Sequence, residues 1–135
     1  MAQKVNGDQV GNTGSAWTDF SGTSTIVGWS SRTVTNLLYK QIGKITYIQY
    51  SIAGASNSTA ATFTVPFAAK SNTLLNTEMA SGYCANSGTA NGPCRVYIDP
   101  NIDASKVFID NGYNGGAWTA SGSKIIRGLY IYEAA

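Results

Sequence analysis

The chain is 135 residues long, carries a formal net charge of +2 and has only 12% charged residues, about half the usual share, so one weakly charged domain is expected. The nine basic residues are scattered, and without a basic run to follow a phosphate backbone, nucleic acid is not expected as a partner. The apolar stretches fall short of the roughly 18 residues of a membrane span, and the N-terminus lacks an apolar signal core, so neither a membrane segment nor secretion by a standard signal is expected.

The first 14 residues are polar and rich in Gly and Asn, which predicts an extended arm over residues 1–14. Residues 15–135 predict one all-β domain, because Tyr, Thr, Val and Ile favour strands while Gly, Asn and Ser favour turns. Short strands between turn residues are typical of an antiparallel β-sandwich, here of jelly-roll type with about eight strands. The expected strands are Ala16–Phe20, Thr33–Ile42, Lys44–Gly54, Ala60–Phe67, Leu74–Asn86, Pro93–Asp99, Lys106–Asp110 and Lys124–Glu133.

The second and third of these strands form the clearest hairpin in the sequence. Gly43 and Lys44 fit the two centre positions of a type II′ turn, where the first residue needs a positive φ. This turn sets Ile42 opposite Ile45. After the turn, both faces of the strand are partly apolar, although a strand with one solvated face should alternate more cleanly. We therefore expect one face to pack in the domain core and the other against a neighbouring subunit.

The last strand, Lys124–Glu133, also has two apolar faces. The first face carries Tyr130 and Tyr132, and the second face is apolar as well. The residues expected at a subunit interface are Ile45, Tyr47, Tyr130 and Tyr132.

A family resemblance rests on an ordered set of strand and turn residues. They are Trp17, Gly28 and Trp29, Tyr39-x-x-Ile-Gly-Lys-Ile-Thr-Tyr-Ile48, Thr62-Phe-Thr-Val-Pro-Phe67, Trp118-Thr-Ala-Ser-Gly122 and Ile126-x-Gly-x-Tyr130. This pattern, over about residues 17–132, resembles small virion modules of tailed bacteriophages. Such modules occur as C-terminal domains of tail fibres, and as head fibres or capsid decoration (cement) proteins.

The resemblance implies a non-enzymatic, homotrimeric jelly-roll protein without a cofactor. Fibre proteins usually carry a long upstream shaft, whereas this chain starts with a 14-residue arm, which favours a separate capsid decoration protein. We expect it to be assembled in the host cytoplasm, to bind the outer capsid surface through residues 1–14 and to stabilise the particle. The alternatives are a receptor-binding tail-fibre tip that recognises host surface glycans, and a free glycan-binding lectin.

Catalytic and metal-binding sites have little support in the sequence. The chain has no His, which removes Ser-His-Asp and Cys-His nucleophilic sites and His-based zinc sites. Asp99 with Asp103 or Asp110 could provide the two carboxylates of a glycosidase. The spacing of Asp99, Asn101, Asp103, Ser105 and Asp110 also matches part of a calcium loop. The favoured interpretation is that these are turn residues bonded to nearby backbone N–H groups, so no catalytic or metal site is assigned.

Cys84 and Cys94 flank a loop centred on Thr89, and in a symmetric hairpin they would lie directly opposite each other. Two thiols packed as small apolar groups are the favoured interpretation, because disulfides are rare in a reducing compartment. A disulfide formed after release remains an alternative, whereas a metal would need further ligands.

The loop 111–116 offers a possible glycan-binding site. Tyr113 lies in this loop and Trp118 follows it, and the two could form a stacking platform with Asn111 and Asn114. The competing interpretation, which is favoured, is that Trp118 plugs the open end of the sandwich or a subunit interface.

Overall fold

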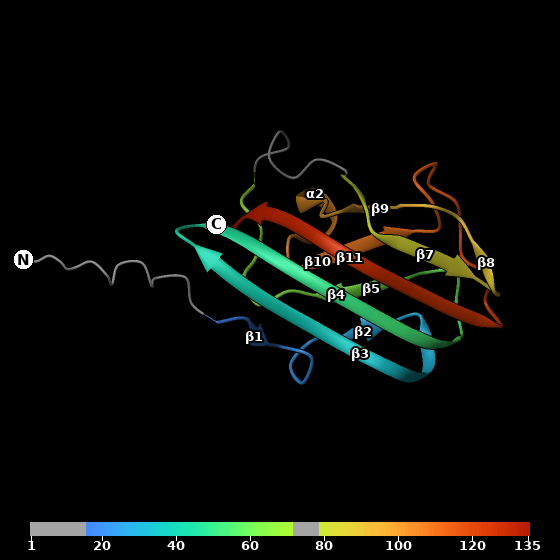
Figure 1. Ribbon diagram of the computed structural model, residues 1–135. Helices are drawn as coiled ribbons and strands as arrows, with labels where there is room; N and C mark the ends of the chain where they lie inside the picture. The colour runs from blue at the N-terminus through green and yellow to red at the C-terminus, as the bar shows by residue number, and fades with distance from the viewer. Residues whose placement is uncertain (1–15, 72–78) are drawn as a thin grey trace, which may run out of the picture.

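The computed structural model describes residues 16–71 and 79–135, and the predicted arm, residues 1–14, lies outside this part of the chain. The described residues form an all-β protein with two antiparallel sheets, of six and five strands (Figure 1). One short helix, α2 (Pro100–Asp103), lies between strands of the smaller sheet. No helix in the described ranges is long and apolar enough to cross a membrane.

The six-stranded sheet runs in the order β1-β3-β4-β11-β7-β8. Its strands are β1 (Thr18–Asp19), β3 (Trp29–Ile42), β4 (Ile45–Ser56), β11 (Ser123–Glu133), β7 (Tyr83–Asn86) and β8 (Thr89–Ala90). The three long strands β3, β4 and β11 lie side by side in its middle (Figure 1). β11 pairs with β4 over its whole length, from Ser123 opposite Ala55 to Glu133 opposite Ile45.

The hairpin of β3 and β4 has the predicted register. Ile42 pairs with Ile45, Tyr39 pairs with Ile48, and Gly43 has a φ of 60°. A residue without a Cβ is favoured at this φ. The pattern of short apolar strands around a Gly-first turn was therefore sufficient to fix the pairing.

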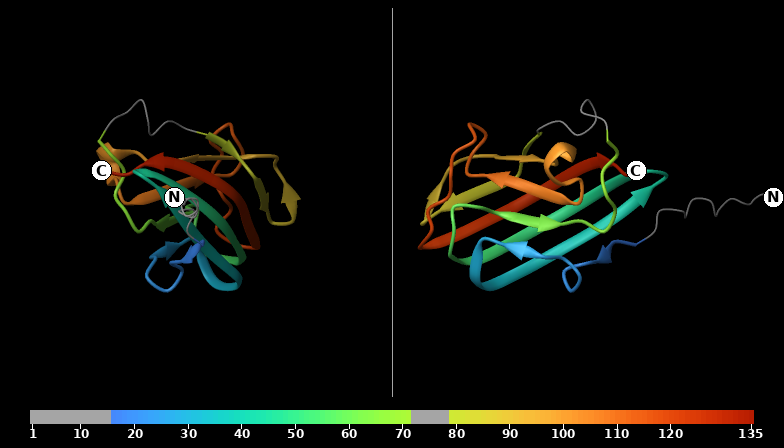
Figure 2. Two further views of the ribbon diagram at one scale, coloured as in Figure 1. Left: turned by 60° about the vertical axis from the view of Figure 1, so that its left-hand side comes forward. Right: turned by 180° about the vertical axis from the view of Figure 1, so that it is seen from behind.

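The five-stranded sheet covers one face of the larger sheet, as the view from behind shows (Figure 2). Its order is β2-β5-β10-β9-β6. The strands are β2 (Ile26–Val27), β5 (Thr62–Thr64), β10 (Lys106–Asp110), β9 (Cys94–Tyr97) and β6 (Met79–Ser81). β10 has the predicted bounds, whereas β2 and β8 were not predicted.

The expected strand Leu74–Asn86 is divided between the two sheets. Residues 72–78 lie outside the described ranges, β6 pairs with β9 in the smaller sheet, and β7 pairs with β11 in the larger one. Gly82 joins the two strands with a φ of 63°, and a Cβ there would overlap the carbonyl of Arg127. The chain changes sheets at a residue that only glycine can occupy. This division, together with the unpredicted β2 and β8, gives eleven strands among the described residues where eight were expected.

The core lies between the two sheets. Ile48 and Ile52 of β4 and Ile126 of β11 face Phe63 and Val107 of the smaller sheet, and all five are fully buried. The ring of Tyr50 lies 5.8 Å from that of Phe63 and leaves no room for a side chain at Gly128, its cross-strand partner on β11. One contiguous hydrophobic cluster therefore holds the sandwich together.

Candidate functional site

The described residues leave one face of the six-stranded sheet, its outer face, uncovered. We use this name for the side chains of β3, β4 and β11 that point away from the smaller sheet. They alternate with the buried residues, because successive side chains of a strand point to opposite faces. The apolar members are Val34, Leu38, Ile42, Ile45, Tyr47, Ala53, Ile125, Leu129 and Ile131. Ile42 is 57% exposed and Leu129 41%, so this face is unusually apolar for a surface that only meets water.

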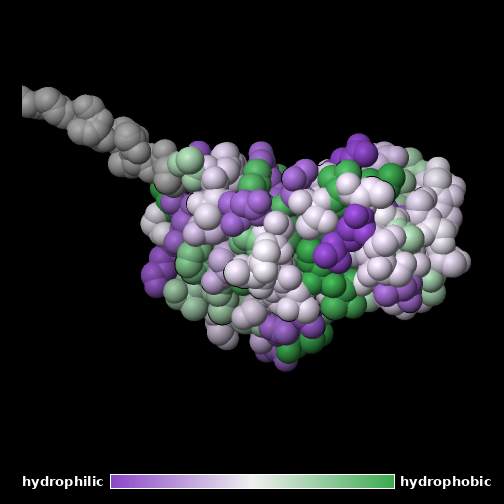
Figure 3. All heavy atoms as spheres, turned by 90° about the horizontal axis from the view of Figure 1, so that it is seen from below, coloured by the Kyte–Doolittle hydropathy of each residue, from purple (hydrophilic) through white to green (hydrophobic). Residues whose placement is uncertain are grey.

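The charged members of the outer face each have a neighbouring partner. The Lys40 ammonium lies 5.3 Å from the centre of the Trp17 ring, and Glu133 pairs with a lysine of the loop after β5 at 3.4 Å. The Arg127 guanidinium lies 5.4 Å from the centre of the Tyr83 ring, which belongs to the neighbouring strand β7. Arg127 therefore keeps one charge near the middle of the outer face, where it pairs with Ser51 of β4. Seen from below, on the side of the sandwich where β1, β2 and β3 lie in Figure 1, hydrophobic and hydrophilic groups are mixed (Figure 3).

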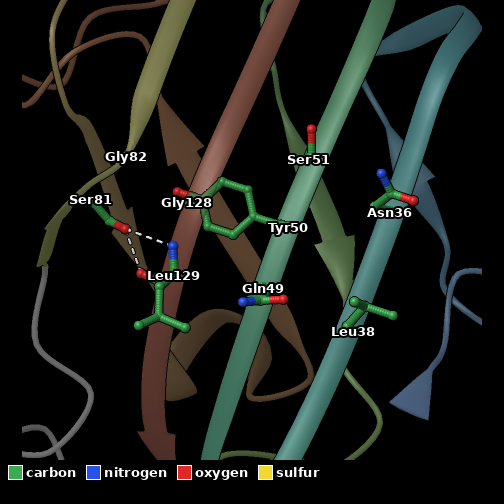
Figure 4. Close-up of a pocket in the computed structure, with 9 residues that line it drawn as sticks. All are labelled: Asn36, Leu38, Gln49, Tyr50, Ser51, Ser81, Gly82, Gly128 and Leu129. Carbon is green, nitrogen blue, oxygen red and sulfur yellow. Dashed lines mark hydrogen bonds between the residues drawn. The ribbon is translucent and has the colours of Figure 1, made fainter. Parts of the chain in front are cut away.

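A shallow groove of about 590 Å³ crosses the outer face near its middle. Leu38, Gln49 and Leu129 lie in one cross-strand row, with Asn36 and Ser51 in the next (Figure 4). At the β11 edge, the Ser81 hydroxyl accepts a hydrogen bond of 3.0 Å from Leu129 N and donates one to Leu129 O (Figure 4). Neutral amides, hydroxyls and leucines suit contact with an uncharged polypeptide surface.

The structure corrects half of the predicted subunit interface. Ile45 and Tyr47 lie on the outer face as expected, but Tyr130 and Tyr132 are 0% and 2% exposed and belong to the core. Tyr130 pairs with the buried Ile48, which fixes its side as the inner one. Both hydroxyls have partners: Tyr130 accepts a hydrogen bond from Ile98 N at 3.0 Å, and Tyr132 donates one to Phe67 O at 2.6 Å. Burial raises the pKa of Tyr130 to about 12. The apolar outer residues on β11 are Ile125, Leu129 and Ile131.

The four predicted glycan-binding residues do not form one platform. Trp118 is 2% exposed, and its indole N–H donates to Ile109 O at 2.9 Å. Asn111 uses its side chain within the protein, donating to Ala117 O and accepting from Asn91. Tyr113, at 49% exposure, and Asn114 remain on the surface. The ring of Trp118 is buried where it closes one end of the sandwich, so a glycan could not stack on it. This is the competing interpretation given above for Trp118.

Trp118 covers a buried lysine that sequence reasoning did not single out. Lys124 is 0% exposed, and its ammonium donates to the carbonyls of Gly28, Ser58 and Ala60 at 2.9, 2.9 and 2.6 Å. The same ammonium lies 5.2 Å from the centre of the Trp29 ring and 5.4 Å from that of Trp118. Three carbonyl dipoles and two indole faces together replace the counter-ion that a buried charge normally needs.

The lysine connects β11 to two other segments, one at Gly28 and one at the loop of Ser58 and Ala60, and no carboxylate of the described residues is bonded to it. Burial lowers the pKa of Lys124 to about 8. All three of its N–H groups are bonded, so its nitrogen has no free lone pair for nucleophilic chemistry while it is protonated. The sequence does contain a signal for this role, since Lys124 lies on the same face of its strand as Ile126 and Tyr130. This signal is easily overlooked, because lysines generally lie on the surface.

Cys84 and Cys94 are free, and both are fully buried. The predicted opposed arrangement in a hairpin is wrong. The β7–β8 turn is centred on Ser87 and Gly88, because Asn86 pairs with Thr89, and Cys94 already belongs to β9 in the other sheet. Their thiols donate to Gly92 O at 3.4 Å and to Tyr83 O at 3.2 Å, respectively. Burial, reinforced by the neighbouring Cys84 thiol, raises the pKa of Cys94, which keeps it protonated and unreactive.

The acidic residues of the possible calcium or glycosidase site are occupied in local structure. Asp99 accepts from Asn101 N at the start of α2, and Asp103 accepts from Ser105 N, both at 2.9 Å. Asp110 pairs with Arg95 at 2.6 Å. Within the described ranges, no group of three or more potential metal ligands is present. The predicted role of Asp99 and Asp103 as turn residues is confirmed.

No family model, no curated protein and no solved structure matches this chain.

Proposed function

We propose that this protein is a non-enzymatic structural protein of the tailed-bacteriophage virion, a trimeric capsid decoration protein that binds the outer capsid surface and stabilises it. In this proposal the sandwich is of jelly-roll type. The observation that carries it is the outer face of the six-stranded sheet, which is apolar and has its few charges already partnered. Such a face matches a surface that is buried against further copies of the chain or against other virion proteins.

The outer face alone is smaller than a standard protein–protein interface. Three strands about 4.8 Å apart, taken over the 11 residues of β11 at about 3.3 Å per residue, present roughly 500 Å² of flat area. A standard interface buries about 800 Å² on each partner. The adjoining β7 and the loops around the groove would therefore take part in the contact.

The arm has a separate role in the proposal. Residues 1–14 precede β1 at the edge of the six-stranded sheet, and we assign them to contact with the capsid or with another virion protein. An extended polar segment can add backbone hydrogen bonds to an exposed sheet edge of a partner. Trimer formation and capsid attachment then depend on different parts of the chain.

The test of self-association is light scattering on the purified protein at micromolar concentration. The wild type should give three times the 14.2 kDa chain mass. Leu129→Lys and Ile45→Lys should give folded monomers, because a lysine in the middle of an apolar interface loses its hydration. Tyr113→Lys, equally exposed but on a loop away from the outer face, is the matched control and should remain a trimer. A monomeric wild type, or a trimer unaffected by the two lysines, would reject this surface as the interface.

Attachment is tested by deleting residues 2–14. The deletion should leave the trimer folded but prevent its incorporation into particles. Binding to a glycan array, abolished by Tyr113→Ala, would instead support the receptor-binding alternative. If the truncated protein occupies particles at the normal level, the assignment of the arm is wrong.

A further inference from the structure

We propose that Asn114 is a site of spontaneous modification, at which the side-chain amide is converted through a cyclic imide to aspartate and isoaspartate. The described residues contain three Asn-Gly pairs, Asn91-Gly92, Asn111-Gly112 and Asn114-Gly115. All three lie in loops at the Lys124 end of the sandwich. A following glycine permits this reaction because it places no Cβ beside the attacking nitrogen. The structure distinguishes strongly between the three pairs.

Asn91 and Asn111 are held by each other. Asn91 Nδ2 donates to Asn111 Oδ1 at 2.7 Å and to Thr89 O at 3.3 Å. Asn111 Nδ2 donates to Ala117 O at 3.3 Å, and the N–H of the buried Gly112 donates to Cys84 Sγ at 3.2 Å. Each amide must give up two hydrogen bonds before its Cγ can approach the next backbone nitrogen. In the Asn111 pair that nitrogen is also shielded from water.

Asn114 has none of these restraints. Its side chain is exposed, and no hydrogen bond holds it among the described residues. Gly115 is exposed as well, has a φ of 81°, and its N–H makes only a long 3.3 Å bond to Gly112 O. Both the carbon that is attacked and the nitrogen that attacks are accessible to water and hydroxide.

The chemistry needs no enzyme and no oxidant. Hydroxide removes the proton from Gly115 N, this nitrogen forms a bond to Asn114 Cγ, and the Cγ–Nδ2 bond breaks. Nδ2 leaves as ammonia after taking a proton from water, which regenerates hydroxide. Water then opens the five-membered imide at either carbonyl, giving aspartate or, with the main chain rerouted through Cγ, isoaspartate.

The modified residue is the neighbour of Gly115, which lies beside an existing ion pair. A Cβ on Gly115 would lie 3.2 Å from the Arg95 guanidinium carbon, and Arg95 is bonded to Asp110. The product lowers the formal net charge of +2 by one unit. Older molecules would therefore differ from new ones in the charge of one exposed loop.

The experiment follows deamidation of the full-length protein at mildly alkaline pH by peptide mapping that resolves aspartate and isoaspartate. The folded protein should react at Asn114 at least about tenfold faster than at Asn91 or Asn111, because those two must first release hydrogen bonds. In urea the three rates should converge, since the local sequences are similar. Asn6-Gly7 lies outside the described residues and is scored as a separate peptide.

Asn114→Gln is the matched control, because it keeps the amide but would have to form a slower six-membered ring. This variant should remove the fast site from the folded protein and leave the other two rates unchanged. Equal rates at the three asparagines in the folded protein would overturn the proposal. So would an Asn114 that reacts in urea but not in the fold.

Discussion

The inner and outer faces of β4 and β11 have similar compositions but different fates. On the inner face, Ile48, Ile52 and Ile126 are fully buried by the five-stranded sheet. On the outer face, Ile45 and Leu129 are 39% and 41% exposed. Side chains that alternate along each strand thus form two apolar surfaces. The fold buries the inner surface and leaves the outer one exposed. The comparison teaches that hydrophobicity alone does not distinguish a residue that folds the chain from one available for association.

The largest expected effect is on the inner face. Tyr130→Ala should lower the free energy of unfolding by about 3–5 kcal/mol, because it opens a cavity in the core. It also leaves Ile98 N, the donor to the Tyr130 hydroxyl, without its partner. Urea denaturation monitored by tryptophan fluorescence measures this loss.

Its matched outer-face variant is Ile131→Ala, at the adjacent position of β11. On the monomer it should cost less than about 1 kcal/mol. A loss as large as that of Tyr130→Ala in the monomer would contradict the division between the two faces. If the loss of unfolding free energy in Ile131→Ala grows with protein concentration, Ile131 belongs to a subunit interface. This result would support the division between the inner and outer faces.

The next largest effect is expected at the buried cation. Lys124→Met keeps most of the side-chain volume but leaves the carbonyls of Gly28, Ser58 and Ala60 without their donor. Stability should fall by about 2–4 kcal/mol, since an unsatisfied buried polar group costs roughly 1–3 kcal/mol and part of this surface can rehydrate. Lys40→Met, on the outer face, is the control and should have little effect. An equally stable Lys124→Met protein would show that the buried lysine is dispensable.

The same lysine also predicts a pH-dependent effect. Its pKa is lowered from 10.5 to about 8 in the folded protein. Between these values the unfolded chain binds more protons than the folded one, so stability due to Lys124 rises with pH, by at most about 1.4 kcal/mol per pH unit. Below pH 8 both states are protonated and this dependence disappears.

The measurement is the difference in unfolding free energy between the wild type and Lys124→Met across this range. The buried tyrosines ionise in the unfolded chain at higher pH in both proteins, so their effect cancels in the difference. A difference that stays flat from pH 8 to 10.5 would mean that the carbonyls and indoles fully compensate the burial of the charge.

The smallest expected effect concerns the two thiols. Because Cys84 and Cys94 are free, a reductant should leave the melting temperature unchanged. A disulfide closing so short a loop would contribute roughly 2–3 kcal/mol. A fall of several degrees on reduction, measured by calorimetry, would therefore reveal a bond between the two sheets.

Local signals in the sequence were sufficient for part of the fold. The Gly43 turn and the apolar alternation around it predicted the register of β3 and β4, because both act within a few residues. Lys106–Asp110 was bounded correctly by turn residues on either side. In contrast, the change of sheet at Gly82 depends on the approach of Arg127, which is distant in the sequence. This change also explains why the predicted opposition of the two cysteines failed.

In the candidate site too, features set by neighbouring residues were predicted, whereas those set by residues distant in the sequence were not. Alternation placed Ile45 and Tyr47 together, but which side of β11 is buried depends on its pairing with β4, so Tyr130 and Tyr132 were assigned to the wrong face. The pocket of Lys124 is built from Trp29, Trp118 and three carbonyls of distant segments. No periodic pattern brings these groups together.

The position of β11 has a consequence for how the protein acquires its structure. Of the described strands, β11 is synthesised after all the others, yet it lies in the middle of the larger sheet, between β4 and β7. The hairpin of β3 and β4 can form early. However, β11, the strand that pairs with β4 on its other side, is missing until residue 133 has left the ribosome. Contacts so distant in sequence slow folding, and they leave the β4 edge open in the nascent chain. Crowded polysomes are thus where this protein would be most prone to pair with the wrong strand.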